Sequence, residues 1–178
     1  MNERGSEALT ILGIDPGYAI LGYGIIGYQA SRHSLIAYGT VETEKEKPLP
    51  MRLKTIYDRL SEIIEEYKPH VCAIEELYFS SNQKTAIKVG EARGAAILAC
   101  AQAGISIYEY TPLQIKQALT GYGRADKHQI QEMVRQILGL ERAPRPDDAA
   151  DAVAAAICHA NSSVYLERVA GVMAANGR

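Results

Sequence analysis

The sequence contains no long apolar run, no excess of basic residues and few cysteines. No stretch reaches the roughly 18 consecutive apolar residues that a membrane-spanning helix needs, and the polar residues at its start do not resemble a signal peptide. The formal net charge of -2 argues against a protein that binds polyanions through its total charge, although local basic patches are compatible with it. We therefore expect a cytoplasmic protein with no membrane partner.

The three cysteines, Cys72, Cys100 and Cys158, each lie within an apolar pattern. An odd number of cysteines with no C-x-x-C spacing argues against a disulfide framework and against a zinc site. We expect all three to be buried thiols in a reducing compartment.

No internal repeat is present either, which excludes a repeat architecture. The chain does have enough apolar residues, 47% of 178, to build the core of one globular domain. We expect residues 9–160 to form this domain, residues 1–8 to be a disordered N-terminus and residues 161–178 to be a C-terminal tail.

Apolar periodicity and turn chemistry predict strands that alternate with helices. The expected strands are residues 9–15, 19–29, 34–43, 71–77 and 105–110. The expected helices lie between Pro48 and Lys68, at 82–103, from Thr111 to near Gly121, after the capping box of Asp126 and Gln129, and at 147–160. The break at 30–33 suits a hairpin, so the first three strands are expected to be antiparallel. The later alternation implies parallel strands, and together these predict an α/β fold with a mixed sheet flanked by helices.

Four carboxylates stand at positions where this fold places ligand sites. Asp15 ends the first strand before Pro16 and Gly17, and Glu75 lies near the end of the fourth. Asp148 and Asp151 are three residues apart at the start of the last helix, so they share one helix face. Burying such a group is very unfavourable unless cations neutralise it, and oxygen ligands suit Mg²⁺ or Mn²⁺. Two such ions can support phosphodiester hydrolysis.

Each carboxylate also has a purely structural interpretation. Asp15 can serve as a turn former, and Asp147 or Asp148 as a helix cap. The strand pattern does not decide between Glu75 and Glu76, and helical spacing does not exclude Asp147, four residues before Asp151. The four carboxylates as a set indicate a metal site more strongly than any one of them.

The glycine motif of residues 22–27 matches G-x-G-x-x-G but lies inside a strand pattern with no helix after it. A dinucleotide site requires a strand before the motif and a helix that opens on it. The glycines are better explained by bulges or by the close approach of another backbone.

Basic and aromatic residues provide candidate contacts to a phosphate backbone. The expected DNA-binding residues are Tyr78, Lys84, Lys88, Arg93, Lys116, Arg124 and Lys127. The competing interpretations are a solvated basic face for each lysine and core packing for Phe79 beside Tyr78.

Segments 13–17, 73–76, 90–94 and 148–152 resemble, in order and context, the RuvC family of Holliday-junction resolvases. The similarity extends over about residues 9–160. It implies a ribonuclease H-like fold, a homodimer and Mg²⁺-dependent nicking of two opposed strands at a four-way DNA junction, in recombination and repair. It also implies cooperation with a branch-migration helicase.

By position, the resemblance implies that a catalytic and metal-binding tetrad is formed by Asp15, Glu75, Asp148 and Asp151. Two Mg²⁺ ions per site, which Mn²⁺ can replace, and 5′-phosphate and 3′-hydroxyl products are implied with it. Lys116 and Lys127 match lysines close to the family's active site, and Tyr78 stands where members often have Phe.

Three other functions are to be weighed against this one. A fragment of a sugar-kinase-like or actin-like ATPase shares the fold, but its ATP cleft needs two such domains. A non-catalytic junction-binding module and a general ribonuclease H-type nuclease are the others, separable by cleavage and by substrate preference.

The small residues of 90–103 are a candidate dimer interface or, equally, a face packed on the sheet.

Overall fold

The computed structural model describes residues 8–77 and 83–176, with side chains described for 8–77 and 85–162. Its strands are β1 (Leu9–Asp15), β2 (Ile20–Gln29), β3 (Arg32–Glu42), β4 (Val71–Glu75) and β5 (Ser106–Tyr110). Its helices are α1 (Leu49–Tyr67), α2 (Gln83–Gln102), α3 (Pro112–Thr120), α4 (Lys127–Ile137) and α5 (Asp147–Asn176).

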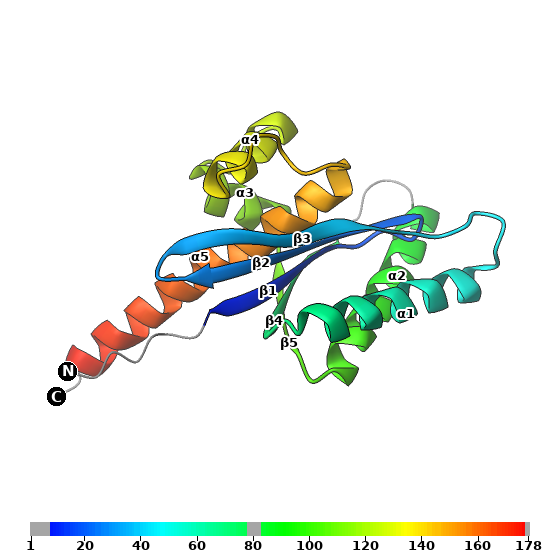
Figure 1. The fold of residues 1–178 in the computed structure, drawn as a ribbon, viewed down its shortest axis with the longest axis horizontal. Helices are drawn as coiled ribbons and strands as arrows, with labels where there is room; N and C mark the ends of the chain where they lie inside the picture. The colour runs from blue at the N-terminus through cyan, green and yellow to red at the C-terminus, as the bar shows by residue number, and fades with distance from the viewer. Residues whose placement is uncertain (1–7, 78–82, 177–178) are drawn as a thin grey trace.

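The five strands form one mixed sheet in the order β3-β2-β1-β4-β5. The pairs β1–β2 and β2–β3 are antiparallel, whereas β1–β4 and β4–β5 are parallel. Helices α1 and α2 cover one face of the sheet, and α3, α4 and α5 cover the other (Figure 1). The predicted mixed α/β fold is therefore confirmed.

Local chemistry explains where several elements begin and end. Thr111 and Asp126 cap α3 and α4 in capping boxes with glutamines three residues on. Lys68 ends α1 in the left-handed conformation before Pro69. The β2–β3 hairpin turns on Ala30 and Ser31, both at positive φ, so β3 begins two residues earlier than predicted.

Two predicted ends are wrong. Strand β4 stops at Glu75 instead of continuing to residue 77. Helix α5 passes through residue 160 and continues to Asn176. The Ser162 hydroxyl donates to the Cys158 carbonyl, and the Asn161 amide donates to Ala118 of α3, so these polar residues are accommodated within the helix. The division of the chain at residue 160 stays a prediction, and residues 1–7 lie outside the described part.

The glycines of β1 and β2 bring the sheet into backbone contact with α5. A Cβ atom on Gly13 would lie 1.9 Å from the Ala152 carbonyl oxygen, and one on Gly22 would lie 1.9 Å from the Asp148 carbonyl oxygen. Gly24, the cross-strand partner of Gly13, would meet Val153 at 2.4 Å. These glycines lie within β1 and β2, and β2 continues into the hairpin with β3 instead of into a helix, so the close backbone approach is confirmed and the dinucleotide motif is excluded.

The two faces of the sheet have separate cores. The core under α1 and α2 includes Ala92, Ala96 and Ala99, so the small residues of α2 pack toward the sheet. This outcome was one of the two alternatives for residues 90–103. All three cysteines are buried free thiols, as predicted. In the described part of the chain, no helix is long and apolar enough to cross a membrane.

We predict that Gly13→Ala lowers the free energy of unfolding by about 3 kcal/mol, because the new methyl group would overlap the Ala152 carbonyl and push α5 off the sheet. The matched control is Gly90→Ala in α2, where a new Cβ would make only an ordinary 3.7 Å contact with Leu77 Cδ1, so this change should be neutral or slightly stabilising. Urea denaturation followed by circular dichroism measures both. A Gly13→Ala protein as stable as the wild type would contradict the backbone contact.

Candidate active site

Asp15 and Glu75 end neighbouring parallel strands and face the same side of the sheet. The register pairs Gly13 of β1 with Ala73 of β4, and each carboxylate follows two residues later. Side chains two apart in a strand share a face, and Gly13 faces α5. Both carboxylates therefore point to the α5 side. Glu76 is one residue further along, so the alternation of side chains places it on the opposite face of the sheet. Its backbone N–H donates to the Tyr110 carbonyl at 2.8 Å.

The start of α5 lies directly over the end of β1. The Asp148 carbonyl contacts Gly22, which is the cross-strand partner of Asp15. Asp151 follows one helical turn later and lines a cavity of about 200 Å³. The lining residues of this cavity are Glu75, Pro112, Ile115, Lys116, Lys127, Ile130, Asp151 and Ala154. The structure thus brings together carboxylates from β1, β4 and α5.

Burial and mutual repulsion disturb the ionisation of these groups. Burial, followed by the negative charges of Glu75, Asp151 and Asp148, raises the pKa of Asp15 to about 8. Burial and the charge of Asp151 raise the pKa of Glu75 to about 7, against the opposing effect of Lys116 and Lys127. Burial also raises the pKa of Asp151, which Lys127 opposes. The site therefore favours an added positive charge.

Lys127 is the cation nearest to the α5 carboxylates. Its Nζ lies 3.2 Å from Asp147 Oδ2 and 3.2 Å from Asp151 Oδ2. Asp147 also accepts hydrogen bonds from Gln131 at 2.9 Å and Arg145 at 2.6 Å. These donors, Lys127 first, hold the pKa of Asp147 below its ordinary value. Sequence reasoning had left Asp147 open as a ligand and had missed the roles of Gln131 and Arg145.

The donor set fits a hard divalent cation. Asp15, Glu75, Asp148 and Asp151 offer only carboxylate oxygens, and the raised pKa values of Asp15, Glu75 and Asp151 show that a positive charge would be stabilised there. Within the described residues, no three side chains stand close enough to hold an ion as they are. One oxygen of Asp151 is engaged by Lys127. An ion would thus be held once the carboxylates turn toward one point.

The predicted DNA-binding residues fall into three groups. Lys116 and Lys127 line the cavity, and Arg124 is exposed in the loop before α4. Lys88 is exposed on α2, with its ammonium 5.4 Å from the centre of the Tyr18 ring. Arg93 lies away from the cavity and pairs with Glu109 of β5.

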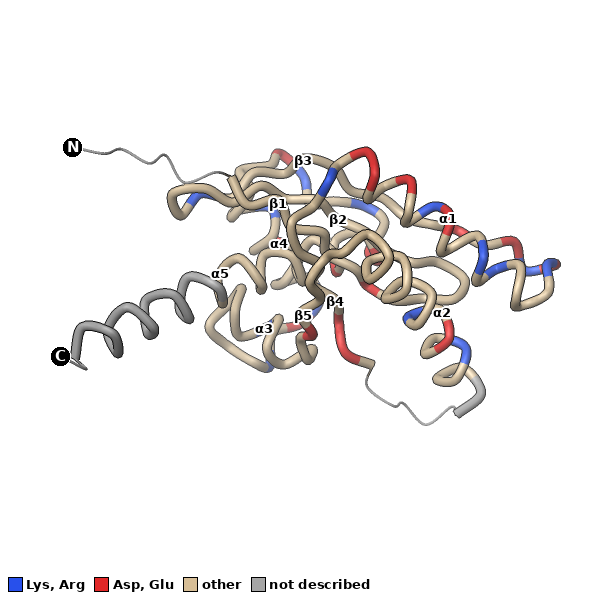
Figure 2. The backbone as a smooth tube through the Cα atoms, turned by 90° about the horizontal axis from the view of Figure 1, so that it is seen from below, with Lys and Arg blue, Asp and Glu red and all other residues tan. Residues whose placement is uncertain are grey.

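Tyr78 and the side chain of Lys84 lie outside the described residues. Figure 2 shows acidic residues where β4 ends.

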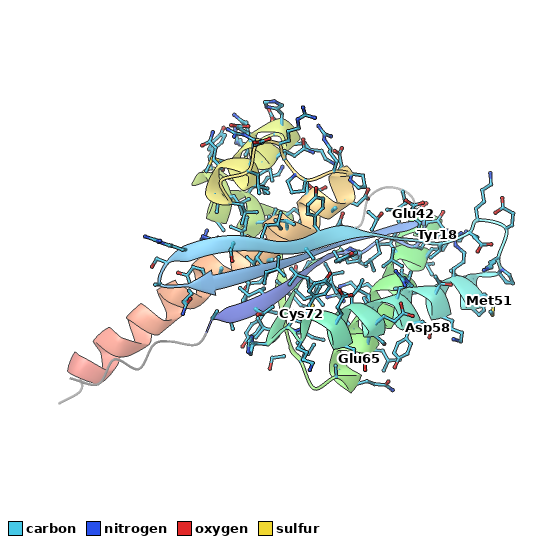
Figure 3. The ribbon with its side chains drawn as sticks, in the orientation of Figure 1. Tyr18, Glu42, Met51, Asp58, Glu65 and Cys72 are labelled. Atoms are coloured by element: carbon cyan, nitrogen blue, oxygen red, sulfur yellow. The ribbon has the colours of Figure 1, made fainter. Side chains whose placement is uncertain are left out.

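The turn after Asp15 is held by a buried arginine that sequence reasoning missed. Arg52 of α1 is 8% exposed, donates to the Tyr18 carbonyl at 3.1 Å and to the Thr43 hydroxyl at 2.8 Å, and stacks on the Tyr18 ring. Figure 3 shows Tyr18 at the end of the sheet where Glu42 ends β3. The one available signal was an arginine beside the apolar stripe of residues 49–67.

We predict that Asp15→Asn stabilises the metal-free protein at pH 8.5 by about 2 kcal/mol. A pKa raised from 3.8 to about 8 means that the folded state binds the proton more tightly than the unfolded state. The stability of the wild type therefore falls as the pH rises from about 4 to 8, and the asparagine variant lacks this loss. Urea denaturation in EDTA at pH 5 and pH 8.5 measures it.

Glu141→Gln, which neutralises an exposed carboxylate, is the control and should change stability little at either pH. Equal pH dependence of the wild type and Asp15→Asn would show that burial and the neighbouring charges do not raise the pKa of Asp15.

The comparisons with known proteins agree on one family. The model of crossover junction endodeoxyribonuclease RuvC matches residues 11–159. A protein of that name from Alkaliphilus oremlandii is 55% identical over 159 residues, which cover 89% of this chain and 97% of the relative. One from Desulfitobacterium hafniense is 53% identical over 165 residues, covering 93% and 100%.

Solved structures share the fold. The structure of Thermus thermophilus RuvC superimposes with a TM-score of 0.82 at 39% identity, covering 88% of this chain and 96% of the other. T. thermophilus RuvC in complex with Holliday junction substrate gives 0.80 at 37% identity over the same shares. The yeast mitochondrial Holliday junction resolvase Ydc2, at 0.68 and 13% identity over 90% and 81%, supports the fold alone. With a family model over most of its length and relatives above half identity, this chain belongs to the RuvC family of crossover junction endodeoxyribonucleases.

Proposed function

We propose that this nuclease resolves four-way DNA junctions by paired, symmetric nicks in recombination and repair. The observation that carries the proposal is the cluster of carboxylates from β1, β4 and α5, in which burial, followed by mutual repulsion, raises the pKa of Asp15 to about 8. A family member is described in complex with a Holliday junction substrate, which supports the same substrate here. Lys116 and Lys127 at the cavity add positive charge for phosphate.

Nucleases of this family depend on a metal ion. We infer that the ions are two Mg²⁺, replaceable by Mn²⁺, and that they are held by Asp15, Glu75, Asp148 and Asp151. Such ions would supply Lewis-acid stabilisation of the negative charge that develops during phosphodiester hydrolysis. The raised proton affinity of Asp15 and Glu75 is the support for this assignment, because a divalent ion relieves the same repulsion that a proton relieves.

The chain's own groups then perform the remaining tasks of hydrolysis. The carboxylates accept hydrogen bonds from the attacking water and take up its proton. The water oxygen bonds to phosphorus while the bond from phosphorus to the 3′ oxygen breaks. The 3′ oxygen takes up a proton from solvent as it leaves, so the products carry 5′-phosphate and 3′-hydroxyl ends. Lys116 and Lys127 hold the phosphate oxygens during this exchange.

DNA arms leaving the cavity would extend over basic residues outside it. Arg124, in the loop before α4, and Lys88, on α2, are exposed and are proposed to contact phosphates, as are Lys84 and Tyr78. Arg93 is proposed as a more distant contact, reached only if DNA competes with Glu109 for its guanidinium.

Two symmetric nicks need two sites related by a two-fold axis, so the active form is proposed to be a homodimer. The supporting surface is the outer face of α2 beside α1, since the inner face packs on the sheet. Leu98 and Ile87 are exposed there at 51% and 62%, and Gly94 leaves room for a second backbone. Leu53, Tyr57 and Ala95 line a groove next to them.

The proposal has three further parts, which rest on the resemblance to the family. The protein cooperates with a branch-migration helicase, it is cytoplasmic, and residues 9–160 form its nuclease domain between two flanking segments.

Cleavage of a synthetic four-way junction in Mg²⁺ tests the nuclease proposal. Wild-type protein should make paired nicks at symmetric positions. Asp15→Asn should bind the junction with unchanged affinity and cut at least about 1,000-fold more slowly, because it loses a charge that both the cation and the water need. Asp58→Asn, the same chemical change on exposed α1, should cut normally.

Junction binding without cutting in Mg²⁺ and Mn²⁺ across several sequences would instead identify a binding module. Equal cutting of linear duplex or RNA–DNA hybrid would remove the claim of junction selectivity.

Leu98→Glu tests the dimer. A charge at the centre of an apolar contact should make the protein monomeric and uncouple the two nicks, so that single-nicked junctions accumulate. Ile36→Glu, at a side chain of equal exposure on β3, should leave the dimer intact. Analytical ultracentrifugation and nicking of a supercoiled cruciform plasmid measure the two effects. A dimeric Leu98→Glu protein would place the interface elsewhere.

A further inference from the structure

Asp147 lies at the start of α5, beside the carboxylate cluster but turned to a different set of partners. Its Oδ2 faces Lys127 Nζ at 3.2 Å, and its Oδ1 accepts from Gln131 Nε2 at 2.9 Å and from Arg145 at 2.6 Å. Three donors from α4 and the α4–α5 connector thus converge on one carboxylate. The residues that line the cavity include Asp151 and Glu75, and Asp147 is not among them.

The partners of Asp147 are themselves fixed. Gln131 is only 8% exposed, so its amide has little freedom to turn away. Lys127 opens α4 directly after Asp126, whose side chain accepts from the Gln129 N–H at 2.8 Å in the capping box. The backbone on either side of the Lys127–Asp147 pair is therefore anchored.

Lys127 is shared between two carboxylates with different tasks. Its Nζ lies 3.2 Å from Asp151 as well as from Asp147. A cation that binds Asp151 must displace the ammonium from that oxygen. When Lys127 releases Asp151, its ion pair with Asp147 remains. Lys127 therefore stays at the edge of the cavity.

We propose that Asp147 is a positioning residue that holds Lys127 at the edge of the active site and makes Asp151 available to a divalent cation. The reading that Asp147 is itself a ligand is disfavoured, because both of its oxygens are already engaged by donors. Without Asp147, Lys127 would pair with Asp151 alone and compete with the cation. The catalytic part of this inference rests on the proposed function, whereas the metal-binding part does not.

Binding of Mn²⁺ to the DNA-free protein tests the inference by isothermal titration calorimetry. Asp147→Asn keeps an acceptor for Gln131 but removes the charge, and it should weaken Mn²⁺ binding about fivefold, the scale of one partly exposed ion pair. Asp147→Glu, which keeps the charge, should recover most of the loss. Glu141→Gln removes an exposed charge from the same connector and should have no effect.

A double-mutant cycle separates positioning from direct attraction of the metal. In a Lys127→Met background, Asp147→Asn should change Mn²⁺ binding by less than twofold, because no ammonium is left to compete. An equal loss in both backgrounds would mean that Asp147 attracts the cation by its own charge, and the proposal would be wrong. Circular dichroism melting of each variant checks that it is folded.

Single-turnover cleavage of the junction provides the second readout. Asp147→Asn should slow cutting at low Mg²⁺, recover partly at high Mg²⁺, and leave the junction affinity in EDTA unchanged. In the Lys127→Met background it should add no further slowing, and a further slowing would contradict the proposal. If the wild type cuts no junction, the proposed function fails, and the Mn²⁺ cycle still decides whether Asp147 positions Lys127.

Discussion

The contact between the α5 backbone and the glycines of β1 and β2 is the constraint on which the active site depends. Only hydrogen atoms at Gly13 and Gly22 let the carbonyls of Ala152 and Asp148 come so near the sheet. Because Gly22 pairs with Asp15, the same contact that seats the helix also sets its first turn over the end of β1. A helix held off by ordinary side chains would stand several ångströms farther away. Its carboxylates would then lie too far from Asp15 to share a cation.

The alanines of α5 complete this arrangement from the other side. Residues Ala149, Ala150, Ala152 and Ala154 to Ala156 are fully buried, so the helix has a narrow surface where it meets the sheet. Because the residues at the contact between α5 and the sheet are small, larger neighbours such as Ile11, Ile26 and Ile157 provide most of the hydrophobic stabilisation. The site and its supporting core are thus built on the same helix, and changes in packing reach the carboxylates directly.

Sequence reasoning placed most of the site, and the remainder depended on three-dimensional register. Asp15 was identifiable because Pro16 and Gly17 end its strand, and the spacing of Asp148 and Asp151 put them on one helix face. The strand pattern left Glu75 and Glu76 open, and only the resemblance to the family favoured Glu75; the pairing of β1 with β4, which no local pattern encodes, puts Glu75 on the same face as Asp15. The contacts of Asp147 with Gln131 and Lys127 span 16 and 20 positions and depend on how α4 packs against α5. The continuation of α5 was not predicted because the pattern beyond Asn161 is only weakly amphipathic, although Asn161 and Ser162 each donate to a carbonyl.

The energetics of the cluster argue for catalysis over simple binding of DNA. A module that only holds a phosphate backbone gains nothing from carboxylates that repel it and repel one another. Raising the pKa of Asp15 to about 8 and that of Glu75 to about 7 amounts to a stability loss at neutral pH, which the fold sustains through the tight packing of α5. Carboxylates that destabilise the fold in this way are expected where their charges perform a task that neutral residues cannot perform. Lys116 and Lys127 offset the burial and repulsion at Glu75 only in part, so the site keeps negative charge that the proposed cation would neutralise.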